Sequence, residues 1–373
     1  MESGIEGASL LAGGSETREM TPKASNNTGL SFDNLQNFES HQAKIMVVGA
    51  GGGGCNTVSR LTDMKIMGAS TIAANTDARH LVSTSAHKKI LLGKTLTRGL
   101  GAGGYPDVGK KAAEESKNEL KEALSGCDLL FITCGLGGGT GTGSAPVIAQ
   151  YAKDAGAIVI AAVTLPFKIE GARIIKAEEG LDKLRQVCDT VIVIENQKLL
   201  ELAGNRPLKE AFGVADTLIA TMIKGITETI SQPSLVNLDY ADVKAILKAG
   251  GVATIGYGES DGKNRAKECI ARALNHPLLN VDYTGATGAL IQVIGGEDLQ
   301  LEEINTIGEA VAQDMNPNAT VMWGARIVPE NEGKLQVITI ITGVTSPYIL
   351  GKGATAAHAA KKASNELGLD LIA

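Results

Sequence analysis

Aromatic residues are scarce in this chain of 373 residues, at 3%, and only five cysteines occur. No two cysteines form a C-x-x-C pair, their number is odd, and the histidines form no H-E-x-x-H motif. We therefore expect reduced thiols in a reducing compartment, with neither a disulfide framework nor a zinc site, and we expect no metal-ligand residues. The cysteines are Cys55, Cys127, Cys134, Cys188 and Cys269.

Long apolar runs are also absent, since no run of about 18 apolar residues occurs. The first residues include Glu2 and Glu6 and lack a basic segment followed by an apolar one, which is not the pattern of a secretory signal. We expect a cytoplasmic protein without a membrane span. The net charge of −6 and the pI near 5.5 disfavour a general nucleic-acid binder.

Glycine, in contrast, is abundant, with 46 residues. Residues 135–144, GLGGGTGTGS, follow an apolar strand-like run at 129–134 and precede a helix-like run at 145–152. Glycines leave backbone N–H groups uncovered, hydroxyls add donors, and a helix N-terminus adds partial positive charge. The segment predicts a phosphate-binding loop. The alternative, a flexible linker, fits poorly between a buried strand and a helix.

Two further glycine-rich loops follow the same logic. Residues 49–54 follow a strand at 44–49 and satisfy G-x-G-x-x-G, and we expect a helix from about Asn56 to Met64 after them. Asp77 follows a strand at 71–74. Taken alone, this half indicates a dinucleotide-binding oxidoreductase of the NAD type, which we keep as an alternative. The loop at 98–109 is the third and precedes a predicted helix at 110–124, and three such loops suit a triphosphate better. No G-x-x-x-x-G-K-[ST] motif occurs, so this is not a P-loop protein.

The alternation of strands and helices predicts an α/β fold with a Rossmann-like, doubly wound parallel sheet and the glycine loops at its carboxyl ends. Apolar residues three and four apart then predict a long central helix, followed by a smaller α/β domain with a mixed or antiparallel sheet. The predicted segments are an N-terminal tail (1–42), a nucleotide domain (43–206), the central helix (207–231), the C-terminal domain (232–344) and a C-terminal tail (345–373) with a helical piece at 354–367.

Five motifs in order resemble the FtsZ family, the prokaryotic cell-division GTPases of the tubulin superfamily. They are NTD at 75–77, GLGAG at 99–103, GGGTGTG at 137–143, PF-x-x-EG at 166–171 and N-x-D-[YF]-A-D-V at 237–243. The similarity spans roughly residues 43–344 and implies the tubulin/FtsZ fold. It also implies GTP and GDP as ligands with Mg²⁺, GTPase activity, and head-to-tail cytoskeletal filaments at the division site.

The resemblance assigns nucleotide-binding roles residue by residue. The assigned residues lie in six places: the first phosphate loop, the end of the second strand, the loop near the γ-phosphate, the signature loop, and the positions implied to contact the ribose and the guanine. Phe212 is implied to stack on the purine and Asp216 to accept from guanine N1–H and N2–H. The implied positions are Gly52, Gly53, Gly54, Asn56, Asn75, Ala102, Gly103, Gly104, Gly139, Thr140, Gly141, Glu170, Arg173, Asn196, Phe212 and Asp216.

Asn237, Asp239 and Asp242 are the catalytic candidates that the resemblance implies. By spacing alone, Asp239 and Asp242 lie on one side of a helix's first turn, where capping and dipole support are the favoured explanation, and only the resemblance favours a catalytic role. In the family this loop is inserted into the nucleotide site of the next subunit, where two carboxylates can orient the attacking water. Asn237 is implied to fix the loop or the water.

Some positions depart from the family's pattern. The family's usual arginine four residues after Glu170 is replaced by Ile174, with Arg173 beside it, and the third loop reads GAGGY rather than GAGAN. The acidic, proline-containing terminal peptide of bacterial members is absent, which counts against the usual membrane-adaptor partners. A membrane adaptor or a sister FtsZ-family protein is kept only as a candidate partner through the tails. Because Ile174 replaces the usual arginine, a filament-forming scaffold with weak or no hydrolysis stays an alternative.

Overall fold

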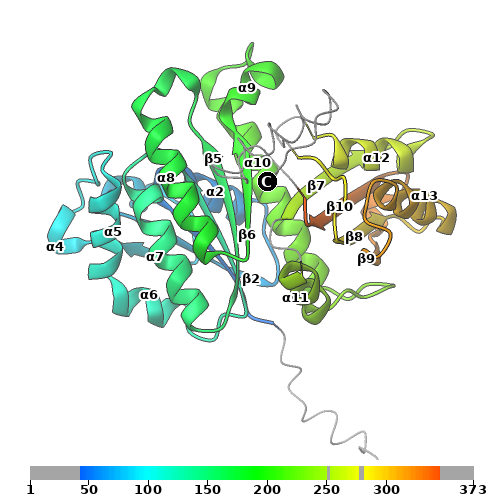
Figure 1. The fold of residues 1–373 in the computed structure, drawn as a ribbon, viewed down its shortest axis with the longest axis horizontal. Coiled ribbons are helices and arrows are strands. Elements are labelled where there is room, and N and C mark those ends of the chain that lie inside the picture. Colours follow the sequence, from blue (N-terminus) through cyan, green and yellow to red (C-terminus); the bar gives the residue numbers. More distant parts are fainter. Residues whose placement is uncertain (1–42, 250–252, 277–280, 345–373) are drawn as a thin grey trace, which may run out of the picture. The chain divides into compact units, whose positions relative to one another are not determined.

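The computed structural model describes residues 43–249, 253–276 and 281–344 (Figure 1). Both predicted tails, including the helical piece at 354–367, lie outside the described residues. Two sheets make up the described part, one of six strands and one of four. Each is covered by helices, as expected for an α/β fold.

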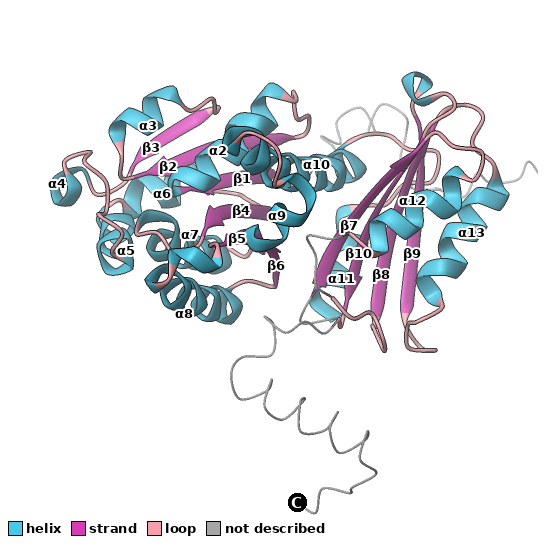
Figure 2. Cartoon of the chain, turned by 90° about the horizontal axis from the view of Figure 1, so that it is seen from above, coloured by secondary structure: helices cyan, strands magenta, loops and turns pink. Residues whose placement is uncertain are grey.

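The first sheet is entirely parallel, with strand order β3-β2-β1-β4-β5-β6 (Figure 2). Strand order reverses between β1 and β4, and ligands bind at such a switch point, outside the carboxyl ends of the strands. The predicted Rossmann-like sheet is therefore confirmed. The strands are β1 (Ile45–Ala50), β2 (Ala69–Asn75), β3 (Lys88–Leu91), β4 (Leu129–Gly135), β5 (Ile158–Leu165) and β6 (Thr190–Glu195).

The strands of this sheet are apolar because helices cover both faces, and β1 is buried along its whole length. The helices are α2 (Gly51–Asp63), α3 (Ala78–Ser83), α4 (Lys94–Thr97), α5 (Pro106–Glu115), α6 (Lys117–Ala123), α7 (Thr140–Asp154), η1 (Lys168–Glu170), α8 (Ala172–Val187) and α9 (Asn196–Ala203). The helix expected at 110–124 is two helices, α5 and α6, which meet at Ser116.

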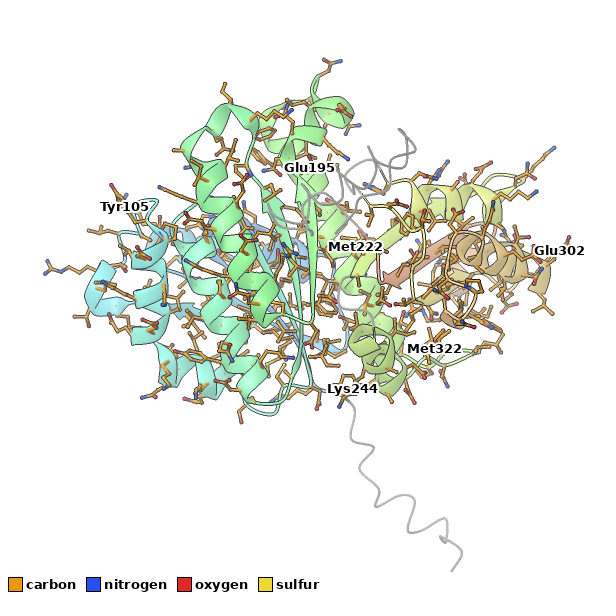
Figure 3. The ribbon with its side chains drawn as sticks, in the orientation of Figure 1. Tyr105, Glu195, Met222, Lys244, Glu302 and Met322 are labelled. Atoms are coloured by element: carbon orange, nitrogen blue, oxygen red, sulfur yellow. The ribbon has the colours of Figure 1, made fainter. Side chains whose placement is uncertain are left out.

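The central helix α10 runs from Leu208 to Ser231, 24 residues. Its apolar residues recur three and four apart, and Met222, labelled in Figure 3, is 1% exposed. The helix contacts α2 and α9 on one side, and β7 and β10 of the second sheet on the other. It therefore joins α2 to the second sheet. A short loop leads from α10 to α11 (Tyr240–Ala249).

The second sheet is mixed, as expected, with order β7-β10-β8-β9 and only the β8–β9 pair parallel. Helices α12 and α13 cover one face, whereas α10 and α11 contact the other (Figure 2). The elements are β7 (Ala253–Ser260), α12 (Arg265–Leu274), β8 (Gly288–Gly295), α13 (Leu301–Ala312), β9 (Thr320–Ile327), η2 (Pro329–Asn331) and β10 (Leu335–Thr342). In the described part of the chain, no helix is long and apolar enough to cross a membrane.

Candidate functional site

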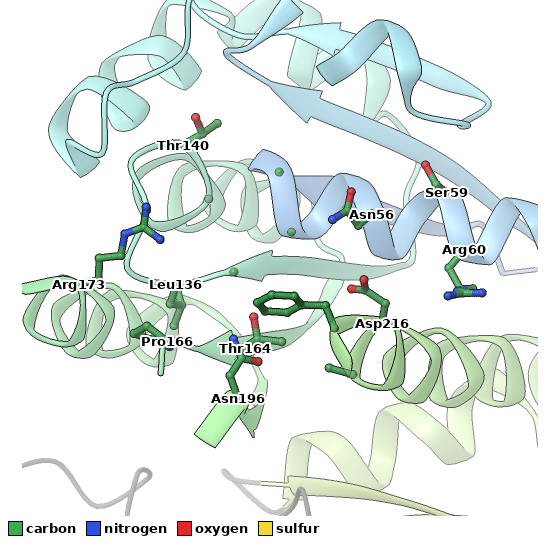
Figure 4. Close-up of a pocket in the computed structure, with 18 of the residues that line it drawn as sticks. Asn56, Ser59, Arg60, Leu136, Thr140, Thr164, Pro166, Arg173, Asn196 and Asp216 are labelled. Carbon is green, nitrogen blue, oxygen red and sulfur yellow. The ribbon is translucent and has the colours of Figure 1, made fainter. Parts of the chain in front are cut away.

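A cavity of about 840 Å³ opens at the carboxyl ends of β1 and β4, at the switch point of the parallel sheet (Figure 4). The loops after these strands, the start of α8, the start of α9 and one face of α10 line it. Its size suits a small-molecule ligand. The cavity lies where the glycine-rich loops were expected to meet.

The first glycine loop is already helical, because α2 begins at Gly51 rather than near Asn56 as expected. Gly51 has a φ of +70°, and a Cβ there would lie 2.7 Å from Gly141 N, so the two phosphate loops touch. Gly52 and Gly53 line the cavity. Gly54 is buried, and a Cβ there would collide with the Thr133 carbonyl, so it permits close packing of α2 on β4.

The signature loop is also shorter than expected, since α7 begins at Thr140. The Thr142 hydroxyl accepts from Gly137 N at 2.9 Å, and the Ser144 hydroxyl donates to Thr140 O at 2.7 Å. These two hydroxyls serve the loop itself, whereas Thr140 lines the cavity together with Gly139 and Gly141. The N-termini of α2 and α7 thus meet at one cavity, which suits an anion.

The third glycine loop does not leave a strand, contrary to expectation; it follows α4. An Asp77–Leu100 bridge ties it to the end of β2. Ala102, Gly103 and Gly104 are not among the cavity-lining residues. Two of them lie against the signature loop, because a Cβ on Gly139 would be 2.9 Å from Ala102 Cβ and 3.1 Å from Gly104 N. The loop therefore lies against the N-terminus of α7.

Phe212 and Asp216 of α10 line the other end of the cavity. The Phe212 ring meets the Phe167 ring edge to face, with centroids 5.6 Å apart, and is 39% exposed. The Thr57 hydroxyl donates to Asp216 Oδ1 at 3.0 Å. Burial raises the pKa of Asp216, while the Thr57 hydrogen bond and the Arg60 charge oppose that rise. An aromatic face beside a carboxylate suits a base with paired N–H donors.

Asn196, at the start of α9, is buried, and its Oδ1 has no partner among the described residues. Buried polar atoms are normally hydrogen-bonded, so an unpaired acceptor facing a cavity fits a donor on a ligand. Asn56 also lines the cavity. Asn75 does not, since its side chain contacts His80 Nδ1 and Asp77 N, both at 3.3 Å.

Glu170 and Arg173 both line the cavity, whereas Ile174 is not among its lining residues. Arg173 Nη1 donates to Glu170 Oε2 at 2.7 Å, and Glu170 Oε1 accepts from Phe167 N at 2.9 Å. Arg173 is therefore the arginine that α8 presents at the cavity, next to the position where the family pattern has one.

Sequence reasoning missed Ser59, Arg60 and Asp63, which also line the cavity. Together with Asn56 they are spaced three, four and seven apart on α2. Such residues share one helix face, so the spacing from Asn56 could have found them.

Asn237, Asp239 and Asp242 do not line this cavity. Asp239 N donates to Asp242 Oδ2 at 3.0 Å and Asp242 N donates to Asp239 Oδ1 at 2.9 Å, a reciprocal cap on α11. Asn237 Oδ1 accepts from Ser234 N at 2.7 Å. Within one chain, the capping interpretation of these residues describes their contacts.

The loop with these residues lies at the opposite end of the parallel sheet from the cavity. The Tyr240 hydroxyl donates to the Asp128 carbonyl at 2.9 Å, directly before β4, whereas Gly135 at the far end of β4 lines the cavity. Figure 3 shows the same separation between Lys244, whose ammonium lies over the Tyr240 ring, and Glu195 at the end of β6.

The donor set at the cavity does not make a metal cage. Among the described residues, no three His, Cys, Asp or Glu side chains gather to hold an ion. Mg²⁺ usually takes few protein ligands and is held mainly by water and substrate phosphates. The residues therefore fit a cation that arrives with a nucleotide and is held mainly by its phosphates and by water.

Comparisons with known proteins agree with this geometry. The profile of the Tubulin/FtsZ family, GTPase domain, matches residues 44–204, and that of the FtsZ family, C-terminal domain, matches residues 251–345. Cell division protein FtsZ 2 of Methanocaldococcus jannaschii is 56% identical over 331 residues, which are 88% of this chain and 87% of that protein. Cell division protein FtsZ 1 of Thermococcus kodakarensis is 52% identical, over 90% of each chain.

Solved structures show the same similarity. An "FtsZ dimer, empty" structure from M. jannaschii superposes with a TM-score of 0.78 at 53% identity, covering 83% of this chain and 91% of that one. CetZ2 of Haloferax volcanii, at 23% identity over 86% of this chain and 99% of that one, shares the fold with a TM-score of 0.70. The chain therefore belongs to the FtsZ family of cell-division proteins and carries a GTPase domain of the tubulin type.

Proposed function

We propose that this protein binds GTP in the cavity and hydrolyses it at a site that a second copy of the chain completes. Subunits then assemble head to tail into cytoskeletal filaments that act in cell division in the cytoplasm. The observation that carries the proposal is the placement of the cavity and of the Asp239/Asp242 pair at opposite ends of β4.

The separation supports a site that is shared between two chains. A strand of seven residues spans about 20 Å, and β4 has seven. The two carboxylates of one chain therefore cannot reach a phosphate on its own loops. A contact between the two different ends of successive subunits is heterologous and generates an open filament. The M. jannaschii relative described as an FtsZ dimer supports self-association.

Most of the proposed chemistry is positioning and charge stabilisation, as is typical of phosphoryl transfer. Backbone N–H groups of Gly52, Gly53, Gly139 and Gly141, with two helix N-termini, would hold the phosphate oxygens. Arg173 would add positive charge, and Phe212 with Asp216 would hold the guanine. A Mg²⁺ ion bound to the phosphates would neutralise further charge.

The next subunit would supply Asp239 and Asp242 to orient the water that attacks the γ-phosphate. Each carboxylate uses one oxygen in the reciprocal cap and has a second oxygen that can accept a hydrogen bond from water. The cap thus holds the pair in a fixed arrangement on α11. Because the cap also explains the pair without catalysis, a scaffold with weak or no hydrolysis is the second candidate. Possible adaptor or sister-protein contacts through the tails belong to the same proposal.

A titration of phosphate release against protein concentration tests the proposal. We expect turnover per subunit to rise with concentration and to level off once sedimentation shows full assembly. Turnover that stays flat over a wide range would contradict a shared site. Assembly without phosphate release would favour the scaffold. The variant Asp242→Ala should keep GTP binding and lose hydrolysis; loss of GTP binding as well would assign the residue a structural role.

A further inference from the structure

The buried hydroxyl of Thr57 connects helix α2 to the Asp216 carboxylate on α10. Thr57 is 1% exposed and does not line the cavity. Its Oγ1 donates to Asp216 Oδ1 at 3.0 Å and lies 3.4 Å from Gly53 O, the weaker of the two contacts. The hydroxyl is thus aimed from α2 across to α10.

Arg60 lies one turn further along α2 and lines the cavity beside Asp216. The absence of a side chain at Gly213 leaves room for the guanidinium, because a Cβ there would lie 3.2 Å from Arg60 Nη2. Thr57 and Arg60 are three residues apart and therefore share a helix face. From α2, the Thr57 hydroxyl thus acts on the Asp216 carboxylate through a hydrogen bond, and the Arg60 guanidinium acts on it through its charge.

We propose that Thr57 is a positioning residue for base selection, whose hydroxyl fixes Oδ1 of Asp216 so that the carboxylate presents an edge to the N1–H and N2–H donors of guanine. This inference rests on the proposed function, because it assigns Thr57 a role only if Asp216 reads the base.

The chemistry favours this role over simple packing. A carboxylate that must accept two parallel hydrogen bonds has to be ionised and held in one plane. A buried carboxylate that loses a hydrogen-bond partner favours its neutral form and can rotate about its own bond. Thr57 supplies the one short hydrogen bond to Asp216 among the described residues, and Arg60 acts on the carboxylate through charge.

Two substitutions separate the hydroxyl from the shape of the side chain. Thr57→Val keeps the branched volume and removes the donor, whereas Thr57→Ser keeps the donor and removes a methyl group. The readout is the dissociation constant for GTP, GDP and ITP, measured by competition against a fluorescent GTP analogue. ITP lacks the N2 amino group, so the ratio of ITP to GTP dissociation constants reports the second hydrogen bond to Asp216.

For Thr57→Val we expect GTP binding to weaken by about tenfold and the preference for GTP over ITP to fall by a similar factor, since a charge-assisted hydrogen bond is lost. The ratio of GTP to GDP should stay as in the wild type, because the phosphate loops are untouched. Thr57→Ser should keep the wild-type ITP preference. Circular dichroism confirms that each variant is folded.

Two results would overturn the inference. Equal weakening of GTP, GDP and ITP by Thr57→Val would show that Thr57 acts only through packing. Loss of the ITP preference in Thr57→Ser as well would show that the hydroxyl is not the cause. Failure of the proposed function would give another result. The wild-type protein would then bind ATP and GTP with equal affinity, and Asp216→Ala would leave the ratio of the two dissociation constants unchanged.

Discussion

The Tyr240 hydroxyl donates a 2.9 Å hydrogen bond to the backbone carbonyl of Asp128, and this contact holds the Asp239/Asp242 loop at the start of β4. The other end of the same strand carries Gly135, which lines the cavity. One rigid strand therefore sets the distance between the two halves of the proposed site within each subunit.

Replacing Tyr240 with Phe removes this hydrogen bond and keeps the ring. We expect a loss of about 1 kcal/mol in the free energy of unfolding, the usual value of one such bond. GTP affinity should not change. Turnover in assembled protein should fall about two- to threefold, because the Asp239/Asp242 loop is held less firmly. Denaturant unfolding, nucleotide binding and phosphate release measure the three quantities. Unchanged turnover would show that the bond is not needed to place the carboxylates.

Asp216→Asn should change which base the cavity accepts. The amide can accept from N1–H and donate to a carbonyl oxygen, which is the pattern of xanthine rather than guanine. We expect GTP affinity to fall by about 10- to 100-fold and XTP affinity to rise. Competition binding with both nucleotides measures the change. A variant that still prefers GTP would show that Asp216 does not contact the base.

Arg173→Ala should weaken nucleotide binding, and Ile174→Ala serves as its matched control. Arg173 lines the cavity, so its removal takes a positive charge from the phosphate end. We expect about tenfold weaker GTP binding for Arg173→Ala and little change for Ile174→Ala. Calorimetry with GTP and GDP measures both. The reverse order would place the functional side chain at 174, as the family pattern has it.

GTP affinity should fall on acidification at a higher pH than an ordinary aspartate would produce. Burial raises the pKa of Asp216 above its usual value of 3.8, and only the ionised form accepts from guanine. Without ligand, the same shift means that protonated Asp216 favours folding, a contribution lost as pH rises through the folded-state pKa. Binding of GTP across a pH series measures the first effect, and XTP binding by Asp216→Asn should lack this titration. The same acid loss in Asp216→Asn would assign it to another group.

The sequence predicted the parallel sheet because its strands are apolar throughout and alternate with helices, as a sheet covered on both faces requires. It did not reveal β3 or α9. The strand β3 is short, lies at the sheet edge and begins with Lys88 and Lys89, so it lacks the apolar run that marks the other strands. Such elements depend on their neighbours in space.

The glycine loops were found from sequence, but their helix starts were placed several residues too late. The glycines at positions 51 and 141 favoured a loop in the prediction, because glycine is a poor helix former. In the structure α2 starts at Gly51 and α7 at Thr140, and glycine stands at 51 and 141 because the two backbones approach more closely than a Cβ would allow. Thr57 escaped notice for a related reason: its partner Asp216 is 159 residues away.

The most direct test of the shared site is a mixture of two variants, Asp242→Ala and Asp216→Asn, supplied with GTP and XTP together. The first binds GTP and lacks the carboxylate that acts on its neighbour, whereas the second keeps that carboxylate and is expected to bind XTP. Neither alone should form GDP. The account predicts GDP formation in an equal mixture, at about a quarter of the wild-type rate for random pairing of subunits. Co-assembly of the two variants without GDP formation would contradict it.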